Sequence, residues 1–352
     1  MSEQEVGDPR AAVAPSDESA RVEKAGASAG SSRGRHLFSG SAGRNLGLVV
    51  ALLLLCVVGF ATAGERFASV SNLMTILSLG SVLGVVSIGM TFVITTGGID
   101  LSVGSVLGLA SVWASTLATQ QMADQYGWIV MVVCALAVGL AAGVINGVII
   151  AYGNVVAFIA TLAMLVAARG LAELIAQRRT QIVDVASFND TFKGNLVGVP
   201  KIVWIFALVA VAGWFLLNRT TFGRRTVAVG GNREAARLAG INVKRHLVYV
   251  YALSGLTAGI AAVMILARTS AGSSTNGTLL ELDVIAAVVV GGTLLAGGRG
   301  TIVGTVLGVL IFTTLTNVFI LNNLDSSVQQ IAKGAIIVVA VLLQQRLARR
   351  ST

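Results

Sequence analysis

Groups of residues that could carry out chemistry are scarce in this sequence. Its two histidines, His36 and His246, stand alone, and no histidine, cysteine or carboxylate residues cluster at the spacing of a metal site. Cys56 and Cys134 lie in apolar runs, as ordinary small apolar residues do. No nucleophile–base pair is visible, and none of the five lysines has the Gly-Lys-Ser/Thr context of a phosphate-binding loop. We therefore predict no catalytic residue, no metal and no cofactor, and any use of ATP would require a separate ATPase chain.

Arg169, Glu173 and Lys333 lie within apolar segments, where a charge is costly if those segments cross a membrane. Arg169 and Glu173 are four residues apart, which places them on one face of a predicted helix and allows an ion pair. We expect structural pairing there. Lys333 stands near one end of the last apolar segment, and we interpret it as an anchor whose charge reaches the membrane surface.

The most informative stretch is the polar segment Asn218–His246, which carries seven of the chain's 25 Lys and Arg residues between apolar neighbours. Within it, Glu234, Ala235 and Ala236 favour a short helix, and Gly240 can end that helix with a positive φ. Such an element fits a partner's groove, whereas the simpler interpretation is a solvated basic loop. The residues assigned to this docking element are Gly231, Asn232, Glu234, Ala235, Ala236, Gly240 and Ile241.

Composition decides the class of protein. Apolar residues make up 55% of the 352 and charged residues 12%, whereas about a quarter of the residues of a soluble domain are charged. No basic face with interleaved aromatic residues indicates nucleic-acid binding. We predict an all-α integral membrane protein of about ten transmembrane helices. Their approximate bounds are Leu46–Ala63, Asn72–Thr95, Leu101–Leu117, Trp128–Ile150, Val155–Ala176, Ile202–Leu217, Leu247–Leu266, Leu282–Ala296, Thr301–Leu321 and Val328–Leu343.

The distribution of positive charge predicts the orientation. With the N-terminus inside, cytoplasmic pieces hold 17 Lys and Arg residues and outer pieces hold 6. This bias favours both termini in the cytoplasm, which requires an even number of crossings, as ten gives. Residues 1–45 are rich in Ser, Ala, Gly and charge and are expected to be a disordered cytoplasmic tail. Residues 46–346 would form the transmembrane domain, and residues 347–352 a cytoplasmic tail.

Two glycine-rich turns link predicted helices at residues 96–100 and 297–300. Residues 97–109 and 297–309 agree at seven of thirteen positions, which allows either an internal duplication or shared composition. Glycines four residues apart after each turn favour close helix packing. Asp100 precedes a helix and can cap it, which we favour over a gating role. The candidates for a path or gate through the membrane are Gly97, Gly98, Asp100, Asn146, Thr161, Gly297 and Gly298.

Several long motifs in order resemble the permease subunit of ABC-type sugar importers of the ribose/xylose class. That class lies within a larger group that includes branched-chain amino-acid permeases. The resemblance covers about residues 46 to 346; Arg169 matches its Arg-Gly pattern, whereas Glu173 does not. The stretches that carry it are TTGGIDLSVGSVLGL (Thr95–Leu109), AFIATLAMLVAARG (Ala157–Gly170), FGRRTVAVGGNREAARLAGINV (Phe222–Val243), YALSGLTAGIAA (Tyr251–Ala262) and ELDVIAAVVVGGTLLAGGRGTIVGTVLG (Glu281–Gly308).

The resemblance implies a multi-pass protein of the bacterial inner (plasma) membrane that passes a ribose-like monosaccharide. Segment 218–246 would be the coupling loop that contacts ABC ATPase subunits, and a homodimer or heterodimer of permease chains would form the path. Outer loops Arg178–Pro200 and Arg268–Leu280 would meet an extracytoplasmic sugar-binding protein. Two alternatives remain open: a branched-chain amino-acid permease, and a self-contained secondary transporter or channel, which would need more charged residues deep in the membrane.

Overall fold

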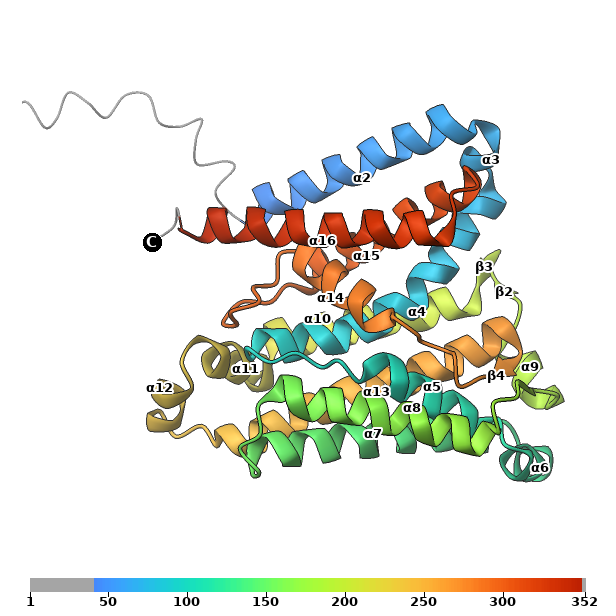
Figure 1. Ribbon diagram of the computed structural model, residues 1–352, viewed down its shortest axis with the longest axis horizontal. Coiled ribbons are helices and arrows are strands. Elements are labelled where there is room, and N and C mark those ends of the chain that lie inside the picture. The colour runs from blue at the N-terminus through green and yellow to red at the C-terminus, as the bar shows by residue number, and fades with distance from the viewer. Residues whose placement is uncertain (1–40, 350–352) are drawn as a thin grey trace, which may run out of the picture. The chain divides into compact units, whose positions relative to one another are not determined.

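The computed structural model describes residues 41–349 and is built almost entirely of helices (Figure 1). Beyond Arg44 the chain forms one compact unit. The predicted tails, 1–45 and 347–352, lie largely outside the described residues. The helices are α2 (Ser41–Ala63), α3 (Glu65–Ala68), α4 (Val70–Thr95), α5 (Val103–Ala114), α6 (Leu117–Tyr126), α7 (Ile129–Ala151), α8 (Ala157–Ala176), α9 (Ala186–Phe192), α10 (Lys201–Arg219), α11 (Thr221–Gly231), α12 (Arg233–Leu238), α13 (Val243–Thr269), α14 (Leu280–Val290), α15 (Ile302–Leu321) and α16 (Ser326–Arg349).

Four two-residue strands form two antiparallel pairs. β1 (Gln181–Ile182) pairs with β4 (Ala271–Gly272), and β2 (Asn195–Leu196) pairs with β3 (Val199–Pro200). The first pair joins the chain after α8 to the chain after α13. It thereby fixes the start of the non-helical stretch that leads to α14.

Within residues 41–349, seven helices are long and apolar enough to cross a membrane: α2, α4, α7, α8, α10, α13 and α15. The chain is an all-α, multi-pass membrane protein, and the count of ten crossings stays a prediction. Two predicted segments are shorter in the structure. α5 ends at Ala114, and α14 ends at Val290 because Gly291 and Gly292 follow, the latter with a φ of 89°.

The core lies around α4 and α13. In their most apolar windows 83% and 78% of the residues are buried, against 11% in α2 and 17% in α10. Because α2 and α10 are apolar and exposed, their outer faces suit contact with lipid. The short helices α5 and α14 pack against this core, so they do not need to span the membrane to be buried.

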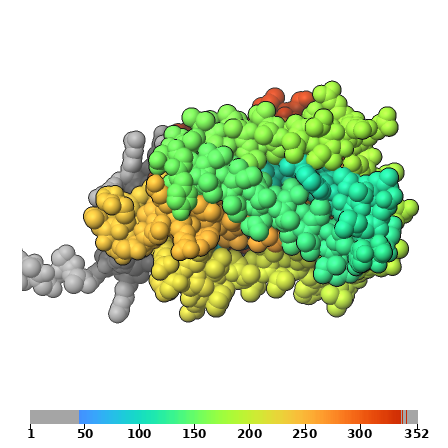
Figure 2. Space-filling model, turned by 90° about the horizontal axis from the view of Figure 1, so that it is seen from below, coloured from blue at the N-terminus to red at the C-terminus, as the bar shows by residue number. Residues whose placement is uncertain are grey.

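Glycines allow the closest helix contact. α7 packs along α13, where a Cβ on Gly143 would lie only 3.1 Å from the Cα of Gly255. In the same way, a Cβ on Gly139 would lie 2.9 Å from the Cα of Gly259. Helices approach this closely in a membrane when small residues line the contact. Figure 2 shows α7 and α8, in green, covering the middle of one face of the molecule.

The short link between α4 and α5 predicts a tight hairpin, which the structure does not form. α5 packs chiefly against α7, α8 and α13. Its glycine face explains the difference. A Cβ on Gly108 would lie 2.7 Å from the main-chain oxygen of Asn276, and Gly104 meets Gly277. The non-helical stretch 273–279 therefore runs along α5, with Ser274 buried and Leu279 exposed.

Candidate functional site

The docking element predicted from the sequence is the six-residue helix α12, and both its ends are capped. The side chain of Asn232 accepts hydrogen bonds from the main-chain N–H groups of Glu234 and Ala235, each at 3.0 Å. Gly240 has the positive φ, 81°, that its position required. Its N–H donates to Arg237 and that of Ile241 donates to Ala236, the bond pattern of a Schellman motif. A helix this short holds its shape through these caps.

α12 turns one small residue inward and leaves the rest exposed. Ala236 is buried in a small cluster with Ala151, Val229 and Leu247. Glu234 and Arg237 form an exposed ion pair of 2.5 Å, and hydrogen bonds from Arg237 lower the pKa of Glu234. Leu238 is 76% exposed. The helix thus offers paired charges and an apolar side chain at one end of the molecule (Figure 1), which suits contact with a soluble partner.

The base of segment 218–246 meets both glycine turns, and we call this contact the glycine junction. It comprises Gly230 at the end of α11, Thr95 and Gly97 at the end of α4, and the pair 297–298 between α14 and α15. The N–H of Gly298 donates to the Thr95 carbonyl at 2.9 Å. A Cβ on Gly230 would overlap that carbonyl, and one on Gly297 would lie 2.8 Å from Gly97 N. Three separate parts of the chain therefore share one close main-chain contact.

Beyond the junction, the link from α4 to α5 is fixed by a buried polar network. Asp100 accepts hydrogen bonds from Ser102 through one carboxylate oxygen, at 3.0 Å from N and 2.6 Å from Oγ. Its other oxygen accepts from Ser254 Oγ of α13 at 2.8 Å. Asn146 Nδ2 of α7 donates to Ser102 Oγ at 2.9 Å, and Thr161 of α8 donates to the Ile99 carbonyl at 3.4 Å. These bonds tie the link to three helices.

A cavity of about 420 Å³ lies beside this link. Gly97 and Gly98 line one side, the α7–α8 connection lines another, and Arg233 at the start of α12 completes it. The structure thus brings all seven of the predicted path residues to two neighbouring places, with Asp100 in the network that holds the link. Asn146 and Thr161 hold the link from within, and Gly297 and Gly298 belong to the glycine junction.

The predicted ion pair between Arg169 and Glu173 is wrong. Arg169 Nη1 donates to the main-chain carbonyls of Ser274 and Asn276, the latter at 3.0 Å. Glu173 instead pairs with Arg178 at 3.2 Å. The physical reason is that the non-helical stretch 273–279 leaves main-chain carbonyls without helical partners beside α8, and a guanidinium supplies several donors.

The interpretation of Lys333 as a surface anchor is also wrong. Its Nζ donates to Asp283 Oδ2 at 2.8 Å, and both side chains are mostly buried. The pair joins α16 to α14. A lysine inside a membrane protein is stabilised by a nearby carboxylate more than by stretching toward distant water.

Sequence reasoning missed Ser254, Tyr251, Gly230 and Leu238. The Tyr251 hydroxyl is buried with no hydrogen-bond partner among the described residues, and a Cβ on Gly98 would meet it. Gly230 was visible as one of a Gly-Gly pair ending a helical stretch, and Leu238 as the apolar residue of a polar helix. Ser254 carried no signal, because its partner Asp100 lies 154 residues away in the sequence.

Comparison with known proteins places this arrangement in a family. The model of the family described as "Branched-chain amino acid transport system / permease component" matches residues 72–341. That range includes the glycine junction, α12 and the Asp100 network.

Several curated relatives match over most of their length. "Ribose import permease protein RbsC" of Escherichia coli (strain K12) is 41% identical over 303 residues, 85% of this chain and 92% of the relative. The RbsC of Bacillus subtilis (strain 168) is 38% identical over 306 residues, which are 86% of this chain and 93% of the relative. "L-arabinose ABC transporter permease protein AraH" of Azospirillum brasilense is 35% identical over 299 residues, which are 85% of this chain and 87% of the relative. No solved structure matches the chain. The chain therefore belongs to the branched-chain amino acid transport system / permease component family.

Proposed function

We propose that this chain is the membrane-spanning permease subunit of an ATP-driven ABC importer of monosaccharides in the bacterial inner membrane. It provides the path for a ribose-like sugar delivered by an extracytoplasmic binding protein, while ABC ATPase subunits supply the energy. Relatives named as ribose and L-arabinose permeases support the substrate class. The family's own description mentions branched-chain amino acids, so these are the alternative substrate.

The observation that carries the proposal is the continuity from α12 to the glycine junction. α12 presents an exposed surface, and the last turn of α11 before it places Gly230 against the Thr95 carbonyl at the end of α4 and against Gly298 N in the link before α15. A push on α12 by an ATPase is thereby passed to the main chain at the ends of α4 and α15. Because the contacts are main chain to main chain, little side-chain motion can absorb the displacement.

The arrangement of the complete importer follows from this role. Two ATPase subunits need two docking helices, so we propose a dimer of permease chains with the path between them. Ten crossings with both termini in the cytoplasm place α12 on the ATPase side. Domain 46–346 is the permease, and loops 178–200 and 268–280 face the binding protein.

Reconstitution tests the function directly. The chain is assembled in proteoliposomes with the ATPase and binding protein encoded beside its gene. Radiolabelled D-ribose, L-arabinose, D-galactose or L-leucine is supplied outside. We expect ATP-dependent uptake of one of the sugars and no leucine uptake.

The chain without its ATPase gives the second arm. It should hydrolyse no ATP and accumulate no sugar, because no phosphate-binding loop is present in its sequence. Accumulation by the ATPase-free chain would favour the secondary transporter, and uptake of leucine alone would favour the amino-acid permease.

A further inference from the structure

A cavity between α4, α13, α14, α15 and α16 has both charged and apolar residues in its lining. It measures about 250 Å³, slightly less than the roughly 300–1,000 Å³ of pockets for drug-sized ligands. Its apolar wall includes Leu79, Val82 and Leu83 of α4. Its polar residues are Arg268, Thr278, Asp283, Thr313, Thr316 and Lys333.

The polar groups of this cavity retain unused hydrogen-bonding capacity. The Asp283–Lys333 pair engages one carboxylate oxygen and one ammonium hydrogen, so the other oxygen and two N–H donors remain. The side chain of Arg268 is exposed and has no hydrogen bond or ion pair with any residue in the described part of the chain. Thr316 donates to the Phe312 carbonyl at 2.9 Å, and its oxygen can still accept.

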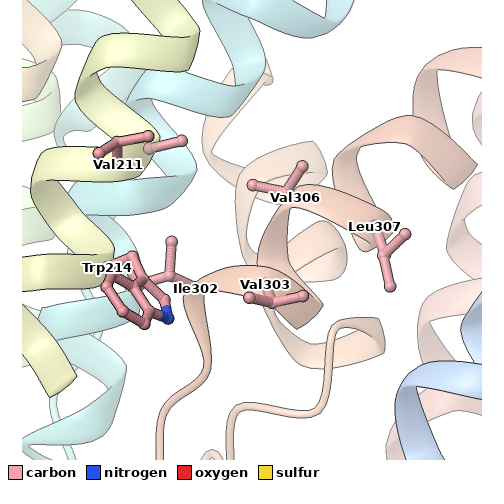
Figure 3. Close-up of a pocket in the computed structure, with 7 residues that line it drawn as sticks. Val211, Trp214, Ile302, Val303, Val306 and Leu307 are labelled. Atoms are coloured by element: carbon pink, nitrogen blue, oxygen red, sulfur yellow. The ribbon is translucent and has the colours of Figure 1, made fainter. Parts of the chain in front are cut away.

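Two other hollows do not combine a carboxylate, hydrogen-bond donors and an apolar wall. Figure 3 shows a groove between α10 and α15 lined by apolar side chains such as Val211, Trp214 and Val306, which suits lipid chains. The cavity near Lys193 and Lys201 contains cations with no carboxylate. In the 250 Å³ cavity, by contrast, a free acceptor, several donors and an apolar wall face the same space.

We infer that this cavity is a monosaccharide-binding site within the permease itself, an inference that rests on the proposed sugar transport. A sugar ring presents hydroxyl groups that both donate and accept, together with an apolar C–H face. The carboxylate of Asp283 opposes an anionic ligand, while neutral hydroxyls can bond to it and to both cations. The site lies where α14 begins after the non-helical stretch 273–279. Transporter substrate sites form at such interrupted helices.

Its position also fits the direction of import. With α12 in the cytoplasm, the cavity lies in the outer half of the bundle, since Arg268 is near the end of α13 that is remote from α12. Sugar released by the binding protein would reach Arg268 first and then the ion pair. The ion pair joins α14 to α16, so a bound sugar would contact the helix that leads to the glycine junction.

Protection of a cysteine tests sugar binding without relying on transport. Thr316→Cys is made in a chain whose Cys56 and Cys134 are replaced by alanine, and its complex with the ATPase is placed in nanodiscs. The rate of reaction with N-ethylmaleimide is measured with D-ribose, L-arabinose, D-galactose, sucrose or inorganic phosphate. One monosaccharide, at about ten times its dissociation constant, should slow labelling about tenfold.

Thr75→Cys is the matched control. Thr75 also donates to the carbonyl one turn back, at 2.9 Å, but lies on an exposed face of α4. No sugar should alter its labelling. In the Thr316→Cys chain, Arg268→Gln should abolish most of the protection, and it removes no internal bond, so the fold is retained. Asp283→Asn should weaken protection as well.

Three results would overturn the inference: equal labelling with and without every monosaccharide, protection by phosphate in place of sugar, or protection that survives Arg268→Gln. These outcomes are independent of the proposed function. If the parental complex imports sugar while the thiol of the Thr316→Cys chain is never protected, the cavity inference fails and the import function stands. If sugar protects the thiol but the parental complex imports no sugar, the cavity inference stands and the import function fails.

Discussion

Gly230 is the residue at which the coupling loop and the membrane helices come closest. Its neighbour Gly231 is chemically identical, but a Cβ added there would meet no atom within 4 Å. Substituting either glycine makes the same chemical change in α11, but only the change at Gly230 disturbs a close contact. Substituting each in turn measures the importance of the glycine junction.

We predict that Gly230→Ala lowers both sugar uptake and the melting temperature. The new Cβ would overlap the Thr95 carbonyl, and forced overpacking costs about 1–3 kcal/mol. Uptake in cells, membrane abundance by immunoblot and thermal melting of the purified chain provide the measurements. Gly231→Ala should leave all three near the parental values. If the two substitutions behave alike, the junction does not transmit motion.

Local and distant interactions differ in how far the sequence predicts them. The end of α12 at Gly240 could be predicted, because a glycine after Glu234-Ala235-Ala236 is a local signal of a helix end. The partners of Arg169 could not, since they belong to a stretch about a hundred residues away whose path depends on the packing of α5. The prediction that Lys333 is a surface anchor was wrong for the same reason. Its partner Asp283 is placed by the tertiary fold.

At the scale of elements, periodicity and length predict the long helices better than the short ones. α4, α13 and α15 match predicted segments closely, because they are long and apolar throughout. α5 and α14 differ because they are only 12 and 11 residues long and are buried by the helices around them. Apolarity in a sequence indicates burial, and it does not distinguish burial in lipid from burial in protein.

α12 is the element whose integrity the proposed function needs, and its C-terminal cap tests this. We predict that Gly240→Val reduces co-purification of the ATPase and sugar uptake while membrane abundance stays normal. The φ of 81° at this position costs a non-glycine residue roughly 1–2 kcal/mol, and a β-branched side chain tolerates it poorly. No neighbouring atom would lie within 4 Å of a Cβ added at Gly240, so the effect comes from the backbone conformation and not from a clash.

Gly240→Asn is the control for that prediction, because asparagine adopts the left-handed conformation more readily. It should retain most of the ATPase binding and uptake. Affinity purification of the chain, followed by quantification of the bound ATPase, measures the first quantity directly. Equal ATPase recovery with valine and asparagine would mean that the partner contacts another part of the loop.

At the scale of the whole molecule, the orientation in the membrane decides whether α12 can meet an ATPase. The bias of 17 against 6 positive residues predicts that segment 218–246 lies inside. Two exposed side chains can test it: Leu238 on α12, 76% exposed, and Val197 between β2 and β3, 86% exposed. Both are accessible in the folded chain, so a lack of labelling at either would reflect the side of the membrane or a bound partner.

We predict that an impermeant thiol reagent labels Val197→Cys in intact cells and labels Leu238→Cys only after permeabilisation. Both are made in the chain lacking Cys56 and Cys134, in cells without the ATPase, because a docked partner would shield α12. Ser32→Cys and Arg349→Cys extend the test to the termini. Ten crossings place both termini inside, whereas seven would place them on opposite sides. Labelling of Leu238→Cys from outside would put α12 beyond the reach of a cytoplasmic ATPase, and the coupling through the glycine junction would then have no driving partner.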